Sequence, residues 1–367
     1  MGMLRRCGAP GCEVLTLSAR CCEHEHPRGR GLFDRLHTRI ALVAAVAVLA
    51  ASSAASLAFA RTGSAAIGTG VVVIETNLAF QGGQAAGTGI VLTRSGEVLT
   101  NNHVIRGATT IKVIVPGTGR SYRATVIGYD VSDDGAVLKA RGASNLKTVS
   151  LGDSSKVRRG QSVQAIGNAG GTGHLVSVSG KITAVARAIT VSDDQNGSER
   201  LTGLIETNAA LQPGDSGGPL VNAAGKVIGM DTAASTSSGF VQASSGDGYA
   251  IPINKAVAIA RQIENRHASV KVHVGSTAFL GVEVSANQYG GSGAMVAAVV
   301  SGSPADSAGL TPRDVITGFA GHSIGSPAKL TSLVLGQKAS SRVSITYLDQ
   351  GGAAHSTTVT LASGPPQ

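Results

Sequence analysis

Residues 214–220 have the sequence Gly-Asp-Ser-Gly-Gly-Pro-Leu, and this stretch constrains the fold of the chain more than any other. Small residues on both sides of Ser216 let the backbone turn tightly and expose the serine hydroxyl. The backbone N–H groups of Gly214 and Ser216 can then converge on a carbonyl oxygen as it becomes negatively charged. The stretch therefore predicts a nucleophile at Ser216 and an oxyanion hole formed by Gly214 and Ser216. An ordinary glycine-rich turn is the alternative interpretation.

A serine hydroxyl is a weak nucleophile at neutral pH and needs a neighbouring base, normally an imidazole that a carboxylate orients. His103 is the natural candidate for this base. It follows an apolar strand in the sequence Leu-Thr-Asn-Asn-His-Val-Ile at residues 99–105, and the other histidines after residue 60 lack a comparable setting. The sequence therefore predicts that His103 activates Ser216.

The carboxylate that orients the imidazole should come from another strand end of the same sheet. Residues 128–138 contain three candidates, Asp130, Asp133 and Asp134. Asp134 leads directly into the next apolar strand, so it is predicted to complete the triad. Asp130 and Asp133 are predicted to brace the turn, because aspartate side chains often accept hydrogen bonds from nearby backbone N–H groups.

The composition favours a β-rich fold, because the chain has 50 glycines, no tryptophan and only 3% aromatic residues. Short apolar or alternating runs separated by turn residues recur after residue 70, as all-β barrels require. The first set of runs covers residues 71–75, 87–93, 110–115, 123–128 and 136–140, and the second covers residues 162–166, 175–185, 203–207, 226–231 and 249–253. Two successive β-barrels are the simplest interpretation, and residues 254–266 have the pattern of a connecting helix.

Four motifs in this order resemble those of the HtrA (Deg) proteases of the membrane-anchored actinobacterial type. They are Thr-Asn-Asn-His-Val at residues 100–104, the Asp134 segment, Thr-Asn-Ala-Ala-Leu-Gln-Pro-Gly-Asp-Ser-Gly-Gly-Pro-Leu at residues 207–220, and Gly-Tyr-Ala-Ile-Pro-Ile-Asn at residues 248–254. The resemblance implies a chymotrypsin-like double β-barrel followed by a PDZ domain. It also implies His103 as general base, Asp134 as its orienting group and Ser216 as nucleophile, in a homotrimer.

A PDZ domain is also indicated by the residues after the second set of runs. Residues 303–316 resemble the central segment of such a domain. The carboxylate-binding loop of a PDZ domain captures a peptide C-terminus with consecutive backbone N–H groups while the peptide adds a strand. The residues predicted to form this loop, for hydrophobic C-terminal peptides, are Phe279, Leu280, Gly281 and Val282.

The sequence departs from the family pattern at four places. Gly135 replaces an aliphatic residue after the predicted catalytic aspartate, which puts the local packing in doubt. Asp215 stands where many relatives have asparagine, and its side chain is expected to point away from the nucleophile. Arg313 replaces a usual glycine and Ala320 a usual asparagine, so the turns there are expected to differ in detail.

Two Gly/Ser-rich stretches, residues 192–200 and 233–248, are predicted to be too flexible to form strands. The resemblance implies that such loops shape the specificity pocket and switch the site on. Disordered surface connections are the alternative.

Residues 40–60 carry no charge and are bounded by Arg39 and Arg61. About 20 apolar residues suffice to span a bilayer as a helix. Seven arginines precede this segment, which predicts a cytoplasmic N-terminus, a single membrane-spanning helix and an exported remainder. A retained anchor is favoured, and secretion after cleavage following Ala60 is the alternative, because Ala-Phe-Ala at residues 58–60 fits a signal peptidase site.

All the cysteines precede the membrane segment, where a reducing cytoplasm would keep them as thiols. The candidate ligands for a structural zinc ion are Cys7, Cys12, Cys21, Cys22 and His24. An unstructured tail with reactive thiols is the alternative. No catalytic metal and no cofactor are expected in the exported part. The net charge of +9 is spread along the chain without a Lys/Arg run, so no nucleic-acid partner is predicted.

The predicted organisation has five parts: a cytoplasmic region at residues 1–39, a transmembrane helix at 40–60, a linker at 61–70, a trypsin-like protease domain at 71–266 and a PDZ domain at 275–364. The predicted function is cleavage of unfolded or misfolded exported proteins under control of the PDZ domain. A non-catalytic envelope chaperone or peptide-binding scaffold is the alternative.

Overall fold

The computed structural model describes residues 68–192, 198–232, 235–236, 239–240, 248–269, 271–288 and 290–367, and the backbone of two short paired strands, β1 (Arg5–Arg6) and β2 (Leu15–Thr16). The chain divides into two compact units, Met1–Arg61 and Thr62–Gln367. The predicted membrane segment, most of the linker and the candidate zinc ligands lie outside the described residues. Within the described residues, no helix has the length and apolar character needed to cross a bilayer.

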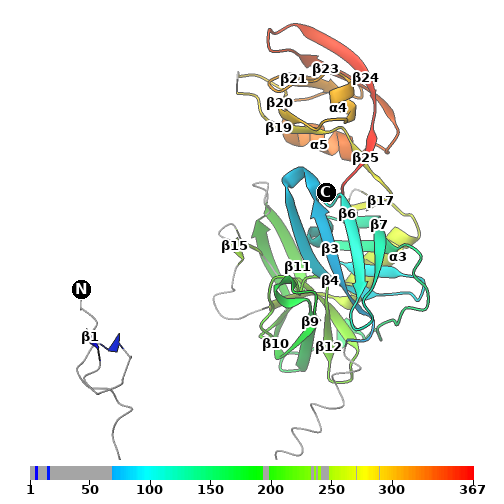
Figure 1. Ribbon diagram of the computed structural model, residues 1–367, viewed down its shortest axis with the longest axis vertical. Helices are drawn as coiled ribbons and strands as arrows, with labels where there is room; N and C mark the ends of the chain where they lie inside the picture. The colour runs from blue at the N-terminus through cyan, green and yellow to red at the C-terminus, as the bar shows by residue number, and fades with distance from the viewer. Residues whose placement is uncertain are drawn as a thin grey trace, which may run out of the picture. The chain divides into compact units, whose positions relative to one another are not determined.

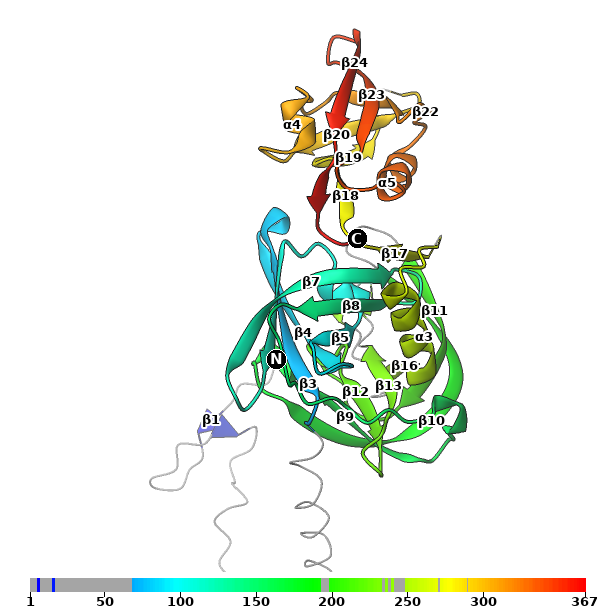
Figure 2. The same ribbon diagram turned by 90° about the vertical axis from the view of Figure 1, so that its right-hand side faces the viewer.

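The first sheet curls into a barrel because β7 and β8 at its two ends also pair with each other. The barrel order is β7-β6-β3-β4-β5-β8 (Figures 1 and 2). Its strands are β3 (Val71–Leu78), β4 (Gly83–Val91), β5 (Glu97–Thr100), β6 (Thr110–Val115), β7 (Arg120–Asp130) and β8 (Gly135–Ala140). The Val-Val-Val-Ile start of β3 is buried on both faces, as β-branched residues on a packed sheet permit.

The second sheet is a closed antiparallel barrel with the order β10-β11-β16-β13-β12-β9. Its strands are β9 (Ser162–Gly167), β10 (Val176–Ser192), β11 (Ser198–Thr207), β12 (Pro219–Asn222), β13 (Val227–Thr232) and β16 (Gly248–Pro252). Closure leaves no free sheet edge. Two-residue strands β14 (Ser235–Thr236) and β15 (Gly239–Phe240) pair with each other. The fold therefore contains the two successive barrels that the sequence predicts.

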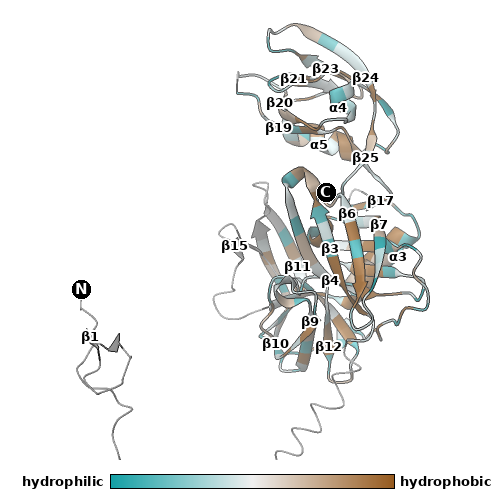
Figure 3. Ribbon diagram, viewed as in Figure 1, coloured by the Kyte–Doolittle hydropathy of each residue, from teal (hydrophilic) through white to brown (hydrophobic). Residues whose placement is uncertain are grey.

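Four short helical segments connect these strands. The helix α2 (Asn102–Ile105) follows β5, and the 3-10 turns are η2 (Ala79–Gln81), η3 (Ser154–Lys156) and η4 (Ala169–Gly171). The apolar side chains of the strands gather inside the barrels, and Figure 3 shows apolar residues along strands such as β6. A further cluster joins residues of both barrels, including Ile90 and Met230, so the barrels share a core.

The helix α3 (Ile253–Glu264) was predicted as a connector, but it belongs to this shared core. Its buried residues recur at helical spacing, and Ile253, Ile259 and Ile263 pack into the cluster between the barrels. Figure 2 shows the helix beside β13 and β16, which it contacts. The chain then adds β17 (Val272–Val274) to β7. The first sheet therefore extends past the predicted connector.

The remaining residues form a five-strand path in the order β19-β20-β21-β23-β24, with a separate pair of strands, β18 and β25. The elements are β18 (Thr277–Phe279), β19 (Val282–Ala286), β20 (Ala294–Val299), α4 (Pro304–Ser307), β21 (Val315–Phe319), β22 (His322–Ser323), α5 (Pro327–Leu335), β23 (Arg342–Leu348), β24 (Ala354–Thr360) and β25 (Ala362–Gly364). Ser303 and Ser326 cap α4 and α5 by accepting backbone hydrogen bonds. Buried Phe319, Leu330 and Ile345 anchor a core of this part alone.

The prediction that residues 192–200 and 233–248 form no strands was wrong in part. Ser192 ends β10, and β11 begins at Ser198, where the two strands pair antiparallel. Thr190 and Arg200 are paired across this hairpin, and both side chains are exposed. Polar residues are therefore tolerated in these strand ends. Within the second stretch, β14 and β15 form a short hairpin.

Candidate active site

The predicted base and its orienting carboxylate lie together in the structure. His103 lies in α2, directly after β5, and Asp134 directly precedes β8, which pairs with β5. The His103 Nδ1 is 2.8 Å from Asp134 Oδ2, and the His103 backbone N–H donates to Asp134 Oδ1 at 3.0 Å. The carboxylate therefore fixes both the ring and the main chain of His103, and leaves Nε2 as the ring nitrogen that can face a nucleophile.

Asp134 is held from both barrels. Asn101 Nδ2 donates to its carbonyl oxygen at 3.0 Å, and Thr232 Oγ1 from β13 donates to Oδ2 at 3.2 Å. The side chain of Asp134 is only 5% exposed, whereas that of His103 is 38% exposed. A buried carboxylate with several donors is a fixed negative charge that stabilises a positively charged imidazole. Asp134 also has a φ of +51°, a backbone conformation that aspartate tolerates better than most residues.

The neighbouring aspartates brace the turn, as the sequence predicts. Asp130 Oδ1 accepts a hydrogen bond from the Asp133 N–H at 3.0 Å. Asp133 forms ion pairs with Lys255 at 2.7 Å and Lys271 at 3.6 Å. Partial burial opposes ionisation of Asp133, but the two lysines outweigh it and lower the pKa of its carboxyl. These contacts fix the loop that carries Asp134.

Packing against α3 explains why a glycine stands at position 135, and the sequence alone does not reveal this contact. A Cβ at this position would lie 3.3 Å from Cγ2 of Ile259, a residue of α3 that packs between the barrels. A larger aliphatic side chain would push against the helix. The glycine is therefore compatible with the fold and leaves the position of Asp134 intact.

Ser216 lies on the turn that leads into β12 of the second barrel, and this turn is hydrogen-bonded to the first barrel. The Ser216 carbonyl oxygen accepts a hydrogen bond from Thr88 N–H in β4 at 2.9 Å. A Cβ at Gly87 would meet both the Val104 side chain of α2 and the Ser216 carbonyl oxygen, which places the turn beside α2. The next residue, Gly217, donates to the carbonyl of Asp231 at 2.9 Å. Asp231 precedes Thr232, the residue that donates to Asp134, so the three predicted triad residues share one network of contacts.

The direction of the Gly214 N–H, a predicted oxyanion-hole donor, follows from the hydrogen bond of the preceding carbonyl. The carbonyl oxygen of Pro213 accepts a hydrogen bond from Gly170 N–H at 2.7 Å. Because a trans peptide is planar with its C=O and N–H on opposite sides, the Gly214 N–H points away from Gly170. Among the described residues, this N–H donates to no protein acceptor. Gly214 has a φ of +97°, and a Cβ there would overlap the Asn168 carbonyl oxygen, so only glycine fits.

Two buried carboxyl groups belong to this turn or lie next to it, those of Asp215 and Asp231. Asp215 Oδ2 accepts a hydrogen bond from Gln212 N–H at 2.8 Å, and burial raises the pKa of its carboxyl. Asp231 is completely buried, and neither of its carboxyl oxygens has a hydrogen-bond partner among the described residues. Burial, followed by the nearby Asp215 charge, raises the pKa of Asp231 well above its ordinary value. Both effects favour a neutral Asp231 carboxyl. Sequence reasoning missed this residue, because only the fold brings it beneath the turn.

The predicted peptide-binding loop lies between β18 and β19. Gly281 has a φ of +88°, and a Cβ would collide with Ser303. The carbonyls of Leu280 and Gly281 accept hydrogen bonds from Ala305 and Val300. Because the β19 strand that follows is at one end of the five-strand path, its free edge can receive an added strand.

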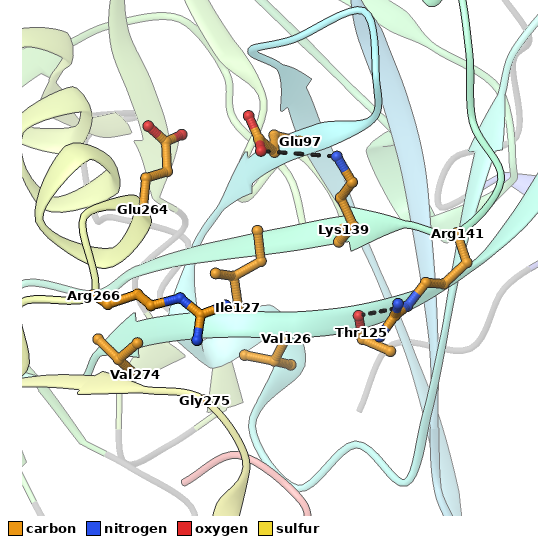
Figure 4. Close-up of a pocket in the computed structure, with 10 residues that line it drawn as sticks. All are labelled: Glu97, Thr125, Val126, Ile127, Lys139, Arg141, Glu264, Arg266, Val274 and Gly275. Carbon is orange, nitrogen blue, oxygen red and sulfur yellow. Dashed lines mark hydrogen bonds and ion pairs between the residues drawn. The ribbon is translucent and has the colours of Figure 1, made fainter.

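A cavity of about 370 Å³ lies away from this network and is lined mainly by β7, β8 and the residues flanking α3. Figure 4 shows Glu97 paired with Lys139, 3.8 Å apart, and Arg141 bonded to Thr125. Glu264 lies in the same cavity, and burial, with the nearby Glu97 charge, raises the pKa of its carboxyl. None of the lining residues belongs to the predicted triad, so the chemistry is assigned to the junction of the barrels.

No group of three or more acidic, histidine or cysteine side chains in the described part of the chain could hold a metal ion. The N-terminal candidates Cys7, Cys12, Cys21, Cys22 and His24 lie outside that part, so the zinc site stays a prediction.

Comparisons with known proteins define the class of this chain. Residues 87–230 match the family described as trypsin-like peptidase domain, and residues 278–361 match the family described as PDZ domain. The fold and these two matches together define a trypsin-like peptidase domain followed by a PDZ domain.

The relatives identify the family more closely. A probable periplasmic serine endoprotease, DegP-like, of Hahella chejuensis is 38% identical over 72% of this chain, and serine protease PepD of Mycobacterium tuberculosis is 33% identical over 79%. The chain spans only 55% and 63% of the length of these two curated relatives. The structure of the HtrA-type protease AlgW with tripeptide is 30% identical, and the match covers 84% of this chain and 98% of that one, with a TM-score of 0.49. The chain belongs to the HtrA (DegP-like) family of serine proteases.

Proposed function

We propose that the chain is a serine endopeptidase that cleaves unfolded or misfolded exported proteins. Asp134 orients His103, His103 is the general base, and Ser216 is the nucleophile. The observation that carries the proposal is the pairing of His103 with Asp134, at 2.8 Å, in one network of contacts with the turn of Ser216, where the Gly214 N–H points away from Gly170. The described residues include a candidate for each group that acyl transfer needs: a nucleophile, a base, an orienting carboxylate and oxyanion donors.

The proposed reaction has two halves. His103 Nε2 removes the proton of Ser216 Oγ as the oxygen attacks the substrate carbonyl, and the N–H groups of Gly214 and Ser216 stabilise the resulting oxyanion. Asp134 stabilises the imidazolium that forms. His103 then gives its proton to the leaving amine, which departs and leaves an ester on Ser216. Water repeats the sequence, with His103 as base, and releases the carboxylic acid and the free serine.

The test is cleavage of β-casein, an unfolded protein, by the purified full chain and by a Ser216→Ala variant. We expect fragments from the unchanged chain and none from the variant, whose fold should be intact because the change removes only one oxygen atom. If both preparations cleave at the same rate, the activity is not that of Ser216. If neither cleaves, even with hydrophobic C-terminal peptides added, the chaperone or scaffold function replaces this proposal.

The PDZ domain is proposed to bind hydrophobic C-terminal peptides and to regulate cleavage. The binding residues would be the backbone N–H groups of the loop formed by Phe279, Leu280, Gly281 and Val282, with the peptide pairing along β19. Titration of a fluorescent peptide ending in a hydrophobic residue tests this. Its binding should be lost in a Gly281→Val variant, because the φ of +88° and the contact with Ser303 exclude a side chain.

Direct contacts of this domain, and of the residues that follow it, with the barrel that carries His103 support regulation. The Phe279 ring stacks on Phe80 of η2, with ring centroids 5.4 Å apart. The Gly107 N–H donates to the carbonyl of Pro366 at 2.8 Å. Asn102 Nδ2 donates to the main-chain oxygen of Gln367 at 3.0 Å, and Asn102 directly precedes His103 in α2. A peptide that moves Phe279 would therefore act on residues linked to the base.

We further propose that residues 71–266 and 275–364 act outside the cytoplasm, anchored by a single helix at residues 40–60 with the N-terminus inside. The uncharged stretch bounded by Arg39 and Arg61 supports this placement. The N-terminal sequence of the mature protein distinguishes an anchored chain from one released after Ala60. Family membership supports a homotrimer, which the mass of the detergent-solubilised protein tests.

A further inference from the structure

Thr88, in the middle of β4, is fully buried, and each of its polar groups is hydrogen-bonded. Its N–H donates to the Ser216 carbonyl at 2.9 Å, and its carbonyl accepts from Thr100 Oγ1 at 2.8 Å. Its hydroxyl donates to the Gly214 carbonyl at 2.7 Å and accepts from the Asn168 N–H at 2.9 Å. The Asn168 N–H can only donate, so the hydroxyl hydrogen is directed to Gly214.

These bonds fix the peptide groups on both sides of the Gly214 Cα. The Pro213 carbonyl, on one side, is held by Gly170 N–H, and the Gly214 carbonyl, on the other, is held by the Thr88 hydroxyl. Glycine has no Cβ to restrict its φ and ψ angles, so an unrestrained turn could rotate and redirect the Gly214 N–H. The two bonds remove that freedom.

The Thr88 hydroxyl also connects two segments of the second barrel: the one that contains Asn168 and the turn that contains Gly214. Asn168 precedes η4, and η4 contains Gly170, the residue that holds the Pro213 carbonyl. Asn168 Oδ1 in turn accepts from the Gly173 N–H at 2.7 Å. One oxygen atom from the first barrel therefore fixes a loop of the second barrel and the turn that carries the predicted nucleophile.

We infer that Thr88 is a positioning residue for the oxyanion hole: its hydroxyl holds Gly214 so that the Gly214 N–H faces the substrate carbonyl. The inference rests on the proposed endopeptidase function. The hydroxyl donates its hydrogen to Gly214 and reaches neither Ser216 Oγ nor the substrate, so it acts only through Gly214. Sequence gives no hint of this role, because the two residues are 126 positions apart.

The test compares Thr88→Val, which removes the hydroxyl at nearly constant volume, with Thr88→Ser, which retains it. Loss of an oxyanion donor lowers kcat by about 10²–10³-fold. Since Thr88→Val displaces the donor without deleting it, we expect kcat to fall about 10- to 100-fold with KM changed less than about threefold. Thr88→Ser should recover kcat to within about threefold of the unchanged chain. All rates are measured on a peptide substrate with the full chain and divided by the active sites titrated with a fluorophosphonate.

Thr76→Val is the matched control for stability. Thr76 is also buried, in β3 of the same barrel, and its hydroxyl bonds only to the Ala85 carbonyl at 3.2 Å, away from the turn. We expect it to lower the melting temperature to a similar extent and leave kcat unchanged. If Thr88 had only a structural role, Thr88→Val would likewise lower the melting temperature and leave kcat unchanged. If Thr88→Val does not fold, Thr88→Ala serves, because it removes the hydroxyl without the branched side chain.

A kcat within twofold of the unchanged chain for a folded variant without the hydroxyl would overturn the inference. An equal loss of kcat in Thr88→Ser would do the same, because the hydroxyl would then not be the cause. Failure of the proposed function is a separate result: the unchanged chain itself would neither cleave nor react with the fluorophosphonate.

Discussion

At the scale of single residues, the site combines a partly exposed histidine, the predicted base, with buried acids. Asp231 is the extreme case: it lies in β13 next to Thr232 and pairs through its backbone with Gly217 and Gly218. Its carboxyl oxygens have no partner among the described residues, so ionisation would leave an uncompensated charge beneath the nucleophile turn. A neutral carboxyl therefore belongs to the folded state.

We expect Asp231→Asn to stabilise the protein increasingly as the pH rises. The folded-state pKa of Asp231 is raised above its unfolded value, so the folded state holds a proton that the unfolded state releases, and stability falls as the pH rises between the two pKa values. Asparagine removes this dependence. The free energy of unfolding should exceed that of the unchanged chain by about 1–3 kcal/mol at pH 8 and differ little near pH 3.

Chemical denaturation at several pH values measures this effect. The Asp153→Asn variant is the control, because the Asp153 carboxylate is exposed and accepts hydrogen bonds from Ser155 and Asn254, which lower its pKa. Its replacement should reduce stability at pH 8. An Asp231→Asn variant that is equally less stable at pH 8 would show that Asp231 is charged in the folded protein.

The sequence indicates candidate site residues where they belong to local motifs, and it gives no sign of residues that act across the chain. Ser216, His103 and Asp134 each lie in a short recognisable pattern. Thr88 and Asp231 acquire their positions only when strands far apart in the chain pair, and no periodicity or motif reports such a contact. The same holds for Gly135, whose need for a small side chain comes from Ile259 on a later helix.

At the scale of elements, tight turns carry much of the function. The strands themselves follow from apolar runs, and most were predictable within a few residues. The ends of β10 and β11 were not, because polar hairpin strands lack the apolar signal. The turn at Gly214 and the turns of the PDZ domain depend instead on backbone angles that few residues adopt.

Gly214→Ala should abolish the oxyanion hole. The Cβ would overlap the Asn168 carbonyl oxygen, so the turn must shift and carry the N–H away from the substrate. We expect kcat to fall by about 10²–10³-fold in a peptide hydrolysis assay. Gly225→Ala is the matched control, since Gly225 also has a positive φ, +69°, but nothing lies within 4 Å of the added carbon. Similar losses of kcat in both variants would contradict this explanation.

Arg313 and Ala320, which stand where the family pattern has glycine and asparagine, both adopt a left-handed backbone conformation, with φ values of +77° and +48°. The expectation that these turns differ in detail from the family pattern stays a prediction. Left-handed angles cost a residue with a Cβ about 1–2 kcal/mol, and glycine adopts them without strain. Arg313 and Ala320 therefore each carry a backbone strain that a glycine would relieve.

We expect Arg313→Gly to raise the free energy of unfolding of the PDZ domain by about 0.5–1 kcal/mol. Arg342→Gly, at an exposed position in β23, should lower it instead, because glycine weakens a regular strand. Hydrogen exchange of the PDZ core amides reports both changes. A loss of protection in Arg313→Gly would mean that the arginine side chain contributes more than its backbone strain costs.

At the scale of the whole molecule, the peptidase and PDZ parts meet through a small number of defined contacts. The Phe80–Phe279 stack involves the predicted carboxylate-binding loop. Gly107 and Asn102, which lie close to His103 in the sequence, donate hydrogen bonds to the main-chain oxygens of the last two residues of the sequence. These contacts were not predictable from sequence, because they join segments whose individual patterns are unremarkable.

Phe80→Ala should weaken the coupling between peptide binding and cleavage. Aromatic pairs contribute about 0.5–1.5 kcal/mol beyond their buried area, so removal of one ring should reduce the ratio of peptide-stimulated to basal casein cleavage towards one. Val185→Ala is the control, because Val185 is exposed to a similar extent, 47% against 51% for Phe80, and lies in β10. An unchanged ratio in Phe80→Ala would show that the stack does not transmit the signal.

The central claim is that Ser216 is an activated nucleophile, and covalent labelling of the full chain with a fluorophosphonate tests it most directly. Mass spectrometry should locate a single adduct on the peptide that contains Ser216. Labelling should disappear in Ser216→Ala and slow by orders of magnitude in Asp134→Asn, because the histidine would lose its orienting carboxylate. An adduct on another residue, or equal labelling of Ser216→Ala, would contradict the account.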